Sequence, residues 1–218
     1  MVRSFLSNVP TLLNWVGEHG RVYPWRTTQN PWQVYIAEIL LQRTRGDLVE
    51  PVYRGFVSTY PTPRALYEAS ESEIYEQVQT LGFGNQRTRT LQEVARIICE
   101  EFDEQVPRDL ESLQRPWRVG TYCSRATLLF AFDEPMALVD GNFARVFGRV
   151  FDYEMPSQPH KSSQVFELVS GVTPDNPDLA RAFNLAILDL GALICTSNSP
   201  ECERCPVQEA CAYAEQHR

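Results

Sequence analysis

Four cysteines near the end of the chain constrain its fold more than any other feature of the sequence. Spacers of six, two and five residues separate them, at Cys195, Cys202, Cys205 and Cys211. Two cysteines separated by two residues can bind one metal centre, and four thiolates complete the ligand set of a zinc ion or of a [4Fe–4S] cluster. The sequence therefore predicts a metal site whose first role is to fold a loop too short to hold a core.

The cellular setting follows from the other cysteines and from hydropathy. Cys99 and Cys123 lie on apolar helix faces and are interpreted as core thiols, so the 218 residues do not resemble a short secreted disulfide scaffold. The longest apolar run, residues 128–132, is far below the ~20 residues that span a bilayer. The first eight residues lack the apolar stretch of a secretion signal. We expect a soluble cytoplasmic protein with no membrane partner.

The charge of the chain argues against a generic nucleic-acid binder, because its formal net charge is −8. An acidic protein can still carry a basic binding face. Lys161 is the only lysine, so the other basic residues of the Lys and Arg total of 20 are arginine. Arginine presents planar donors that suit phosphates and base edges, but it does not act as an amine nucleophile.

Helical patterns run along almost the whole chain, and no alternating strand interrupts them. Asn30 with Pro31, the box Ser70-x-x-Glu73, and Asp109 are helix starts, and Pro10 predicts that the first helix begins there. Apolar residues at helical intervals predict further helices over residues 32–43, 91–98, 122–132, 143–151 and 178–194. The fold class is all-α.

The cysteine spacing resembles the loop that closes the endonuclease III superfamily of helix-hairpin-helix DNA glycosylases. This resemblance implies two helical lobes: a six-helix domain over 22–132 that holds the hairpin, and a second domain of 1–21 with 133–218 that carries the cluster loop. It also implies a [4Fe–4S] cluster. Zinc is the alternative, although zinc ribbons usually present two C-x2-C knuckles and this chain has one.

The hairpin of that superfamily resembles residues 116–120, which read Pro-Trp-Arg-Val-Gly where the family has Leu-Pro-Gly-Val-Gly. Val119 and Gly120 match the pattern, whereas Arg118 replaces the first glycine. Glycines there let backbone N–H groups approach a phosphate. The resemblance implies DNA contacts by these three residues, with Arg118 offering a side chain instead.

Two carboxylates match the catalytic positions of the family. Asp140 lies just before a helix, where a plain N-cap is the alternative, and the resemblance implies that it stabilises positive charge on the sugar. Glu38 is the only charge between Asn30 and Leu41, and a carboxylate in so apolar a run is costly unless it is paired or used. In adenine glycosylases of this family the matching glutamate protonates the leaving base, so Glu38 is a second catalytic candidate.

Tyr122 bears on both the reaction and the substrate. Glycosylases that also nick the strand carry a lysine at this position, so the chain lacks that nucleophile and we expect a monofunctional enzyme. Thymine glycosylases that act on G·T mismatches carry tyrosine here, which favours thymine or uracil opposite guanine, although a merely packed aromatic is the alternative. Candidate DNA contacts, made once the base is flipped out, are Gln42, Arg43, Asn85, Gln86 and Arg87.

Other functions remain open from sequence alone. Gln42 matches a residue that adenine glycosylases insert into the base stack, so adenine opposite oxidised guanine is an alternative substrate. Those enzymes also carry a separate C-terminal domain, whereas seven residues follow Cys211 here. A hypermodified cytosine of phage DNA and a non-catalytic lesion-binding protein are further alternatives. The expected partner is double-stranded DNA with a mismatched or modified base, bound by a nucleoid-associated monomer active in base excision repair.

Overall fold

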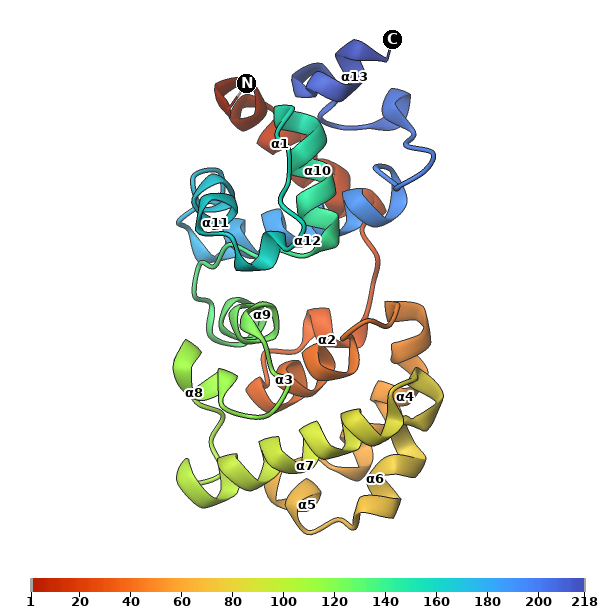
Figure 1. The fold of residues 1–218 in the computed structure, drawn as a ribbon, viewed down its shortest axis with the longest axis vertical. Helices are drawn as coiled ribbons and strands as arrows, with labels where there is room; N and C mark the ends of the chain where they lie inside the picture. Colours follow the sequence, from red (N-terminus) through yellow and green to blue (C-terminus); the bar gives the residue numbers. More distant parts are fainter. Residues whose placement is uncertain (1, 218) are drawn as a thin grey trace. The chain divides into compact units, whose positions relative to one another are not determined.

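The structure is a computed structural model that describes residues 2–217, and every regular element in that range is helical (Figure 1). The all-α prediction is therefore confirmed. The chain divides into two compact units, which we call the hairpin unit (residues 22–132) and the cysteine-loop unit (residues 1–21 and 133–218). No helix in the described range is long and apolar enough to cross a membrane.

The hairpin unit is built around one helix that is buried almost all round. All of its 111 positions are described, and they form eight α-helices rather than the expected six: α2 (Pro24–Thr27), α3 (Pro31–Leu40), α4 (Gly46–Thr59), α5 (Pro63–Tyr67), α6 (Glu71–Val78), α7 (Gly84–Glu101), α8 (Leu110–Gln114) and α9 (Thr121–Phe132). Helix α3 packs against α4, α7 and α9, and its residues 34–40 are all buried. Two buried rings fix it: Trp32 Nε1 donates to Tyr60 O (2.9 Å) and the Tyr35 hydroxyl donates to Leu113 O (2.8 Å).

The cysteine-loop unit joins the two ends of the chain. It contains α1 (Val2–His19), α10 (Gly141–Phe151), α11 (Ser163–Ser170), α12 (Pro177–Leu193) and α13 (Ala212–Gln216), with 3-10 turns at Pro159–Lys161, Cys202–Arg204 and Gln208–Ala210. Helix α1 lies beside α12, and α12 packs on α10, although α1 is far from the other two helices in the sequence (Figure 1). The N-terminal segment of this unit ends at Arg21, whose Nε donates to the fully buried carboxylate of Asp189 (2.7 Å).

One predicted helix start is wrong. Pro10 lies inside α1, which already begins at Val2. Proline removes one N–H from the helix, but the preceding turns are held by packing. Phe5 is completely buried, with ring centroids 5.8, 5.4 and 6.3 Å from Phe147, Phe151 and Phe183. The burial of the Phe5 ring therefore stabilises the helical turns that precede Pro10.

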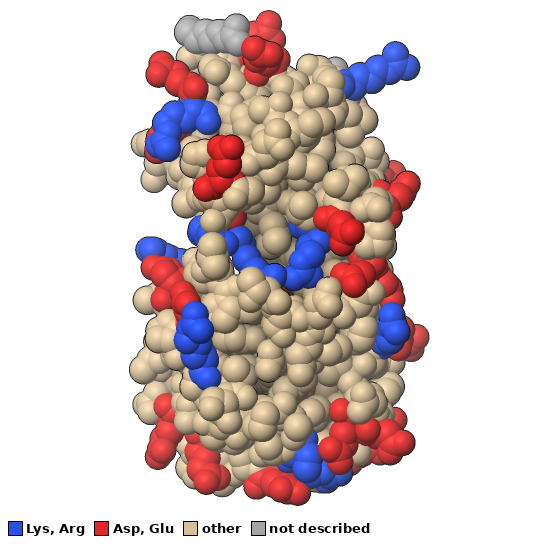
Figure 2. Space-filling model, turned by 180° about the vertical axis from the view of Figure 1, so that it is seen from behind, with Lys and Arg blue, Asp and Glu red and all other residues tan. Residues whose placement is uncertain are grey.

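The other helix starts match the sequence. The Asn30 side chain accepts from Gln33 N, Ser70 and Glu73 form a reciprocal capping box, and Asp109 accepts from Ser112 N. On the face that Figure 2 presents, acidic side chains are spread over much of the surface, whereas basic side chains form small groups. The overall negative charge therefore does not prevent local basic patches.

Candidate active site and metal centre

Glu38 is the buried carboxylate of the hairpin unit. It lies on α3, where its side chain is only 6% exposed. The Cys123 thiol on α9 is close by: burial raises the pKa of that thiol well above its usual value, and the charge of Glu38 raises it further, whereas a hydrogen bond with the Gln42 side chain lowers it. Glu38 and Cys123 are thus buried neighbours on α3 and α9, and the half-buried Gln42, just after α3, reaches the thiol. Tyr122 precedes Cys123 in the first turn of α9 and is half-buried.

The hairpin keeps the backbone shape that glycine favours, although an arginine occupies the position. Arg118 has φ of 64°, in the left-handed region where a side chain is strained. Gly120 does not have positive φ, and an added Cβ there would meet nothing within 4 Å. Gln42 Nε2 donates to Arg118 O (3.2 Å), which ties the hairpin to the end of α3. Arg118 and Gly120 are both exposed.

Two predicted DNA contacts, Val119 and Arg87, are engaged within the protein. Val119 is buried, and its N–H donates to Pro116 O (3.0 Å), so neither its side chain nor its amide is free to contact DNA. Arg87 is only 5% exposed, and its NH1 donates to Ile39 O (2.7 Å) and Leu40 O (3.0 Å). A cation at the last carbonyls of a helix stabilises that helix end, so Arg87 supports the C-terminus of α3.

A hollow of about 320 Å³, partly open to solvent, lies over the end of α3. Five residues predicted to bind DNA line it: Gln42, Arg43, Gln86, Arg87 and Arg118. Asn85 is exposed and does not line it. Phe83, which we did not predict, also lines it; this ring is 49% exposed, and the Arg43 guanidinium carbon is 4.9 Å from its centroid. The signal in the sequence was an aromatic residue between two glycines.

Three residues around this hollow have left-handed backbones without being glycine: Arg43 (φ 59°), Phe83 (φ 54°) and Arg118 (φ 64°). Such strain persists where surrounding structure fixes it, and it concentrates at functional sites. The three come from three separate segments of the chain. Their convergence on one hollow marks this surface as the candidate binding site of the hairpin unit.

Asp140 is the corresponding carboxylate of the cysteine-loop unit. It is the N-cap of α10: its Oδ1 accepts from Phe143 N (2.8 Å) and its Oδ2 accepts from Asn142 Nδ2 (3.0 Å). Burial raises the pKa of Asp140, although these hydrogen bonds and the charge of Arg145 oppose the shift. The N-cap alternative considered from sequence is thus part of the geometry, and it holds the carboxylate in one orientation.

Asp140 is connected to the cysteine loop by a chain of hydrogen bonds within this unit. Asn142, which donates to Asp140, accepts from Arg145 NH2 (2.8 Å), and Arg145 Nε donates to Cys195 O (2.7 Å). Gly191 lets Asn142 lie close against α12, because a Cβ at position 191 would be only 2.7 Å from the Cβ of Asn142. One helix turn further, Arg149 NH1 donates to the Cys195 sulfur (3.3 Å).

The four cysteines of the predicted metal site surround one hollow of about 350 Å³, partly open to solvent, whose other walls are mainly apolar. Burial raises the pKa of Cys205 to about 12; an N–H of Val207 opposes the shift, and the other cysteines add to it. Burial likewise raises the pKa of Cys211. In residues 2–217, no three Cys, His, Asp or Glu side chains are grouped so that they could hold a single metal ion.

This donor set fits a sulfur-bound cluster. Four thiols face one apolar hollow, and N–H groups of Arg149 and Val207 are directed at the sulfurs, as thiolate ligands of iron–sulfur clusters require. A lone zinc ion would need its sulfurs to converge at ~2.3 Å from one point. Ligands of a four-iron cluster instead bind its separate corners, so they surround a hollow.

Comparisons with known proteins agree with this arrangement. Residues 36–170 match the family model of the HhH-GPD superfamily base excision DNA repair protein. The thymine-DNA glycosylase of Aeropyrum pernix is 34% identical over 93% of this chain and 92% of its own length. The human adenine DNA glycosylase is also 34% identical, over 92% of this chain but only 38% of its own length.

The fold agrees as well. A solved structure of a thermostable thymine-DNA glycosylase has a TM-score of 0.90 and 32% identity, with 98% of each chain covered. A structure of an endonuclease III–DNA complex, at 20% identity, has a TM-score of 0.82 and supports the fold alone. The chain therefore belongs to the HhH-GPD superfamily of base excision DNA repair proteins.

Proposed function

We propose that this protein is a monofunctional DNA glycosylase that hydrolyses the N-glycosidic bond of thymine or uracil paired with guanine and leaves an abasic site. The observation that carries the proposal is the similarity to thymine and thymine/uracil glycosylases over nearly the full length of both chains. The substrate is double-stranded DNA, and the mismatched base leaves the stack to react.

Asp140 takes the role of the electrostatic catalyst. Breaking the bond between base and sugar builds positive charge on the sugar ring, and a fixed carboxylate stabilises that charge as it develops. The bonds from Phe143 N and Asn142 hold the carboxylate so that it need not reorient. Burial raises the pKa of Asp140 above its ordinary value. As the pH is lowered, the carboxylate should therefore protonate, and excision should be lost, at a higher pH than for an exposed aspartate.

Glu38 takes the role of the proton donor to the leaving base. A carboxyl group that is 6% exposed is shielded from bulk water, so a proton that it holds can be delivered to the base rather than to solvent. The neighbouring Cys123 thiol has a pKa well above its usual value, so it stays neutral beside Glu38 and does not add a second negative charge. A protonated Glu38 can pass its proton to the base as the bond breaks.

Strand cleavage is not part of the proposed reaction. A lyase needs an amine that attacks the sugar, and Tyr122 stands where strand-nicking relatives carry that lysine. Lys161, the only lysine, is exposed in the short 3-10 turn Pro159–Lys161. The reaction should end at the abasic site.

The cysteines Cys195, Cys202, Cys205 and Cys211 are proposed to hold a [4Fe–4S] cluster. When bound, the cluster supplies structural cross-linking of residues 195–211, which contain only two short 3-10 turns. Arg149 positions the first ligand: its NH1 donates both to the Cys195 sulfur and to Thr196 O (2.7 Å).

Adenine excision is the second candidate. It is favoured by Gln42, which lines the hollow at the end of α3, and by the adenine glycosylase of Mycolicibacterium smegmatis, which is 33% identical over 90% of this chain. Both candidates use the same two carboxylates.

A panel of labelled duplexes separates the candidates. We expect single-turnover excision from G·T and G·U duplexes, with strand breaks only after alkali, and little excision of adenine opposite oxidised guanine or of modified cytosines. Faster excision of adenine, or of a modified cytosine, would overturn the substrate assignment. Binding to mismatched DNA with no excision from any duplex would instead indicate a lesion-binding protein.

A further inference from the structure

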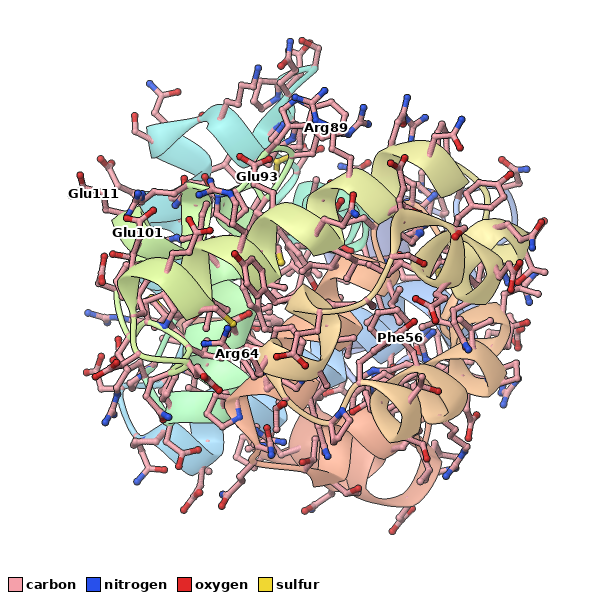
Figure 3. The ribbon with its side chains drawn as sticks, turned by 90° about the horizontal axis from the view of Figure 1, so that it is seen from below. Phe56, Arg64, Arg89, Glu93, Glu101 and Glu111 are labelled. Atoms are coloured by element: carbon pink, nitrogen blue, oxygen red, sulfur yellow. The ribbon has the colours of Figure 1, made fainter. Side chains whose placement is uncertain are left out.

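The hairpin contains a tryptophan whose ring lies beside two arginines from different segments. The guanidinium carbon of Arg118 is 5.2 Å from the centroid of Trp117, and that of Arg89, on α7, is 4.5 Å away. Both distances are in the range of cation–π contacts. Glu93, one turn from Arg89 on the same face of α7 (Figure 3), accepts from Trp117 N with its Oε2 (3.1 Å). The tryptophan is thus fixed against α7 through its own backbone.

These two arginines differ from five others in the hairpin unit. Five exposed or half-buried arginines of this unit form ion pairs with neighbouring carboxylates: Arg45, Arg54, Arg64, Arg96 and Arg115. In the described part of the chain, neither Arg89 nor Arg118 has such a partner, and both are exposed. Glu93, one turn from Arg89 on α7, is hydrogen-bonded to the Trp117 amide. Two guanidinium groups therefore remain available on an acidic protein.

The backbone of the hairpin explains why side chains would be needed there. Arg118 keeps the left-handed conformation (φ 64°), so the turn is preserved, but its side chain adds bulk where glycine would leave the backbone bare. The next amide, that of Val119, is already bonded to Pro116 O. The Arg118 side chain therefore offers an approaching anion a guanidinium group beside this turn.

We propose that Trp117 holds Arg89 and Arg118 as a pair of phosphate-binding groups, so that this hairpin binds the DNA backbone through side chains. Arginine suits the task because its planar donors match phosphate oxygens in pairs. Stacking on one ring restricts both long side chains before DNA arrives, which reduces the entropy lost on binding. Trp117 is a positioning residue in this arrangement. The proposal rests on the proposed function only in taking DNA as the ligand.

Salt-dependent binding to an unmodified duplex without any excisable base tests the pair. Each lost phosphate contact should lower the slope of log K against log salt by about 0.9. Arg89→Ala and Arg118→Ala should each show this change and weaken binding roughly tenfold at low salt, because a hydrogen bond to a charged group is lost. Trp117→Ala should weaken binding more than either, and Trp117→Phe, which keeps a ring, should be intermediate. Arg96→Ala, on the same helix but paired with Glu100, is the matched control and should keep the wild-type slope.

Arg118→Gly separates binding from stability. Glycine relieves the left-handed strain, so the melting temperature should rise by roughly 2–4 °C, while DNA binding and the salt slope should fall as in Arg118→Ala. If Arg118→Gly binds DNA as tightly as the wild type, the hairpin works through its backbone and the proposal is overturned. Wild-type slopes for both Arg89→Ala and Arg118→Ala would overturn it equally.

These outcomes are independent of excision. If the protein excised no base in the duplex panel, yet the salt slope fell in these variants, the proposed function would be contradicted and the arginine pair supported. If it excised thymine normally, yet the salt slopes of the variants were unchanged, the proposed function would be supported and the arginine pair contradicted.

Discussion

The two units place their carboxylates in different settings. In the hairpin unit, Glu38 is 6% exposed on a helix whose residues 34–40 are all buried, with the Cys123 thiol close by. In the cysteine-loop unit, Asp140 is held by directed hydrogen bonds at the start of α10, and those bonds continue to Cys195. Burial raises the pKa of Asp140, and its directed donors oppose that rise. The two settings suit the two proposed roles, a proton donor shielded from solvent and a fixed electrostatic catalyst.

The largest expected effect concerns the cysteine loop, because its short turns have little else to fold around. Cys205→Ser should abolish the brown colour and the roughly four irons per chain expected of a cluster, and should lower the melting temperature sharply. Metal analysis and absorbance check this, with Cys99→Ser as a cysteine control outside the loop. One zinc and no iron in the wild type would contradict the cluster.

The next largest effect tests Glu38, the buried carboxylate of the hairpin unit, as the proton donor. Glu38→Gln keeps the volume but removes the transferable proton, so single-turnover excision should fall about 10²- to 10⁴-fold. The melting temperature is measured beside the rate, so that a loss of excision is not mistaken for a loss of folding. Unchanged excision would make Glu38 a structural residue only.

A smaller effect tests the hydrogen-bonded chain of the cysteine-loop unit. Arg145→Met removes the link between Asn142 and Cys195, and excision should fall ~10- to 100-fold, as for other groups that orient a functional ligand. Arg204→Met, in the cysteine loop but paired with the exposed Glu201, is the control. Equal rates in the two variants, with equal iron content, would show that Asp140 does not depend on this chain.

The smallest effect concerns Tyr122. Tyr122→Ser should slow thymine excision roughly tenfold if its ring stacks on the flipped base, since such stacking is worth ~1–3 kcal/mol. Tyr122→Lys should gain some strand cleavage, which borohydride trapping would detect. A lower melting temperature with an unchanged ratio of G·T to G·U rates would identify Tyr122 as a packing residue.

Local features of this fold were predictable from sequence, and tertiary ones were not. The caps at Asn30, Ser70, Asp109 and Asp140 depend on side chains within three residues of the amides they accept from, so local pattern was sufficient. Helix α4 was missed, because Pro51 inside it disguises the pattern.

Arginine roles were the hardest part of the site to predict. Arg87 and Arg89 are two residues apart in one helix, yet one is buried beneath the end of α3 and the other is exposed beside Trp117. Which of them is exposed depends on segments more than 25 residues away. The same holds for Phe83 and Arg43, whose contact no local pattern encodes.

The most direct test of this account compares two capping aspartates in one excision assay. Asp140→Asn and Asp109→Asn each remove the charge of an N-cap that accepts from an amide at 2.8 Å, and the melting temperature of each variant is measured beside its rate. We predict that Asp140→Asn slows single-turnover excision from a G·T duplex roughly 10²- to 10³-fold with DNA binding retained, because it removes charge stabilisation in the transition state. Asp109→Asn should excise at the wild-type rate. Near-equal rates for the two variants would make Asp140 a helix cap and contradict the account.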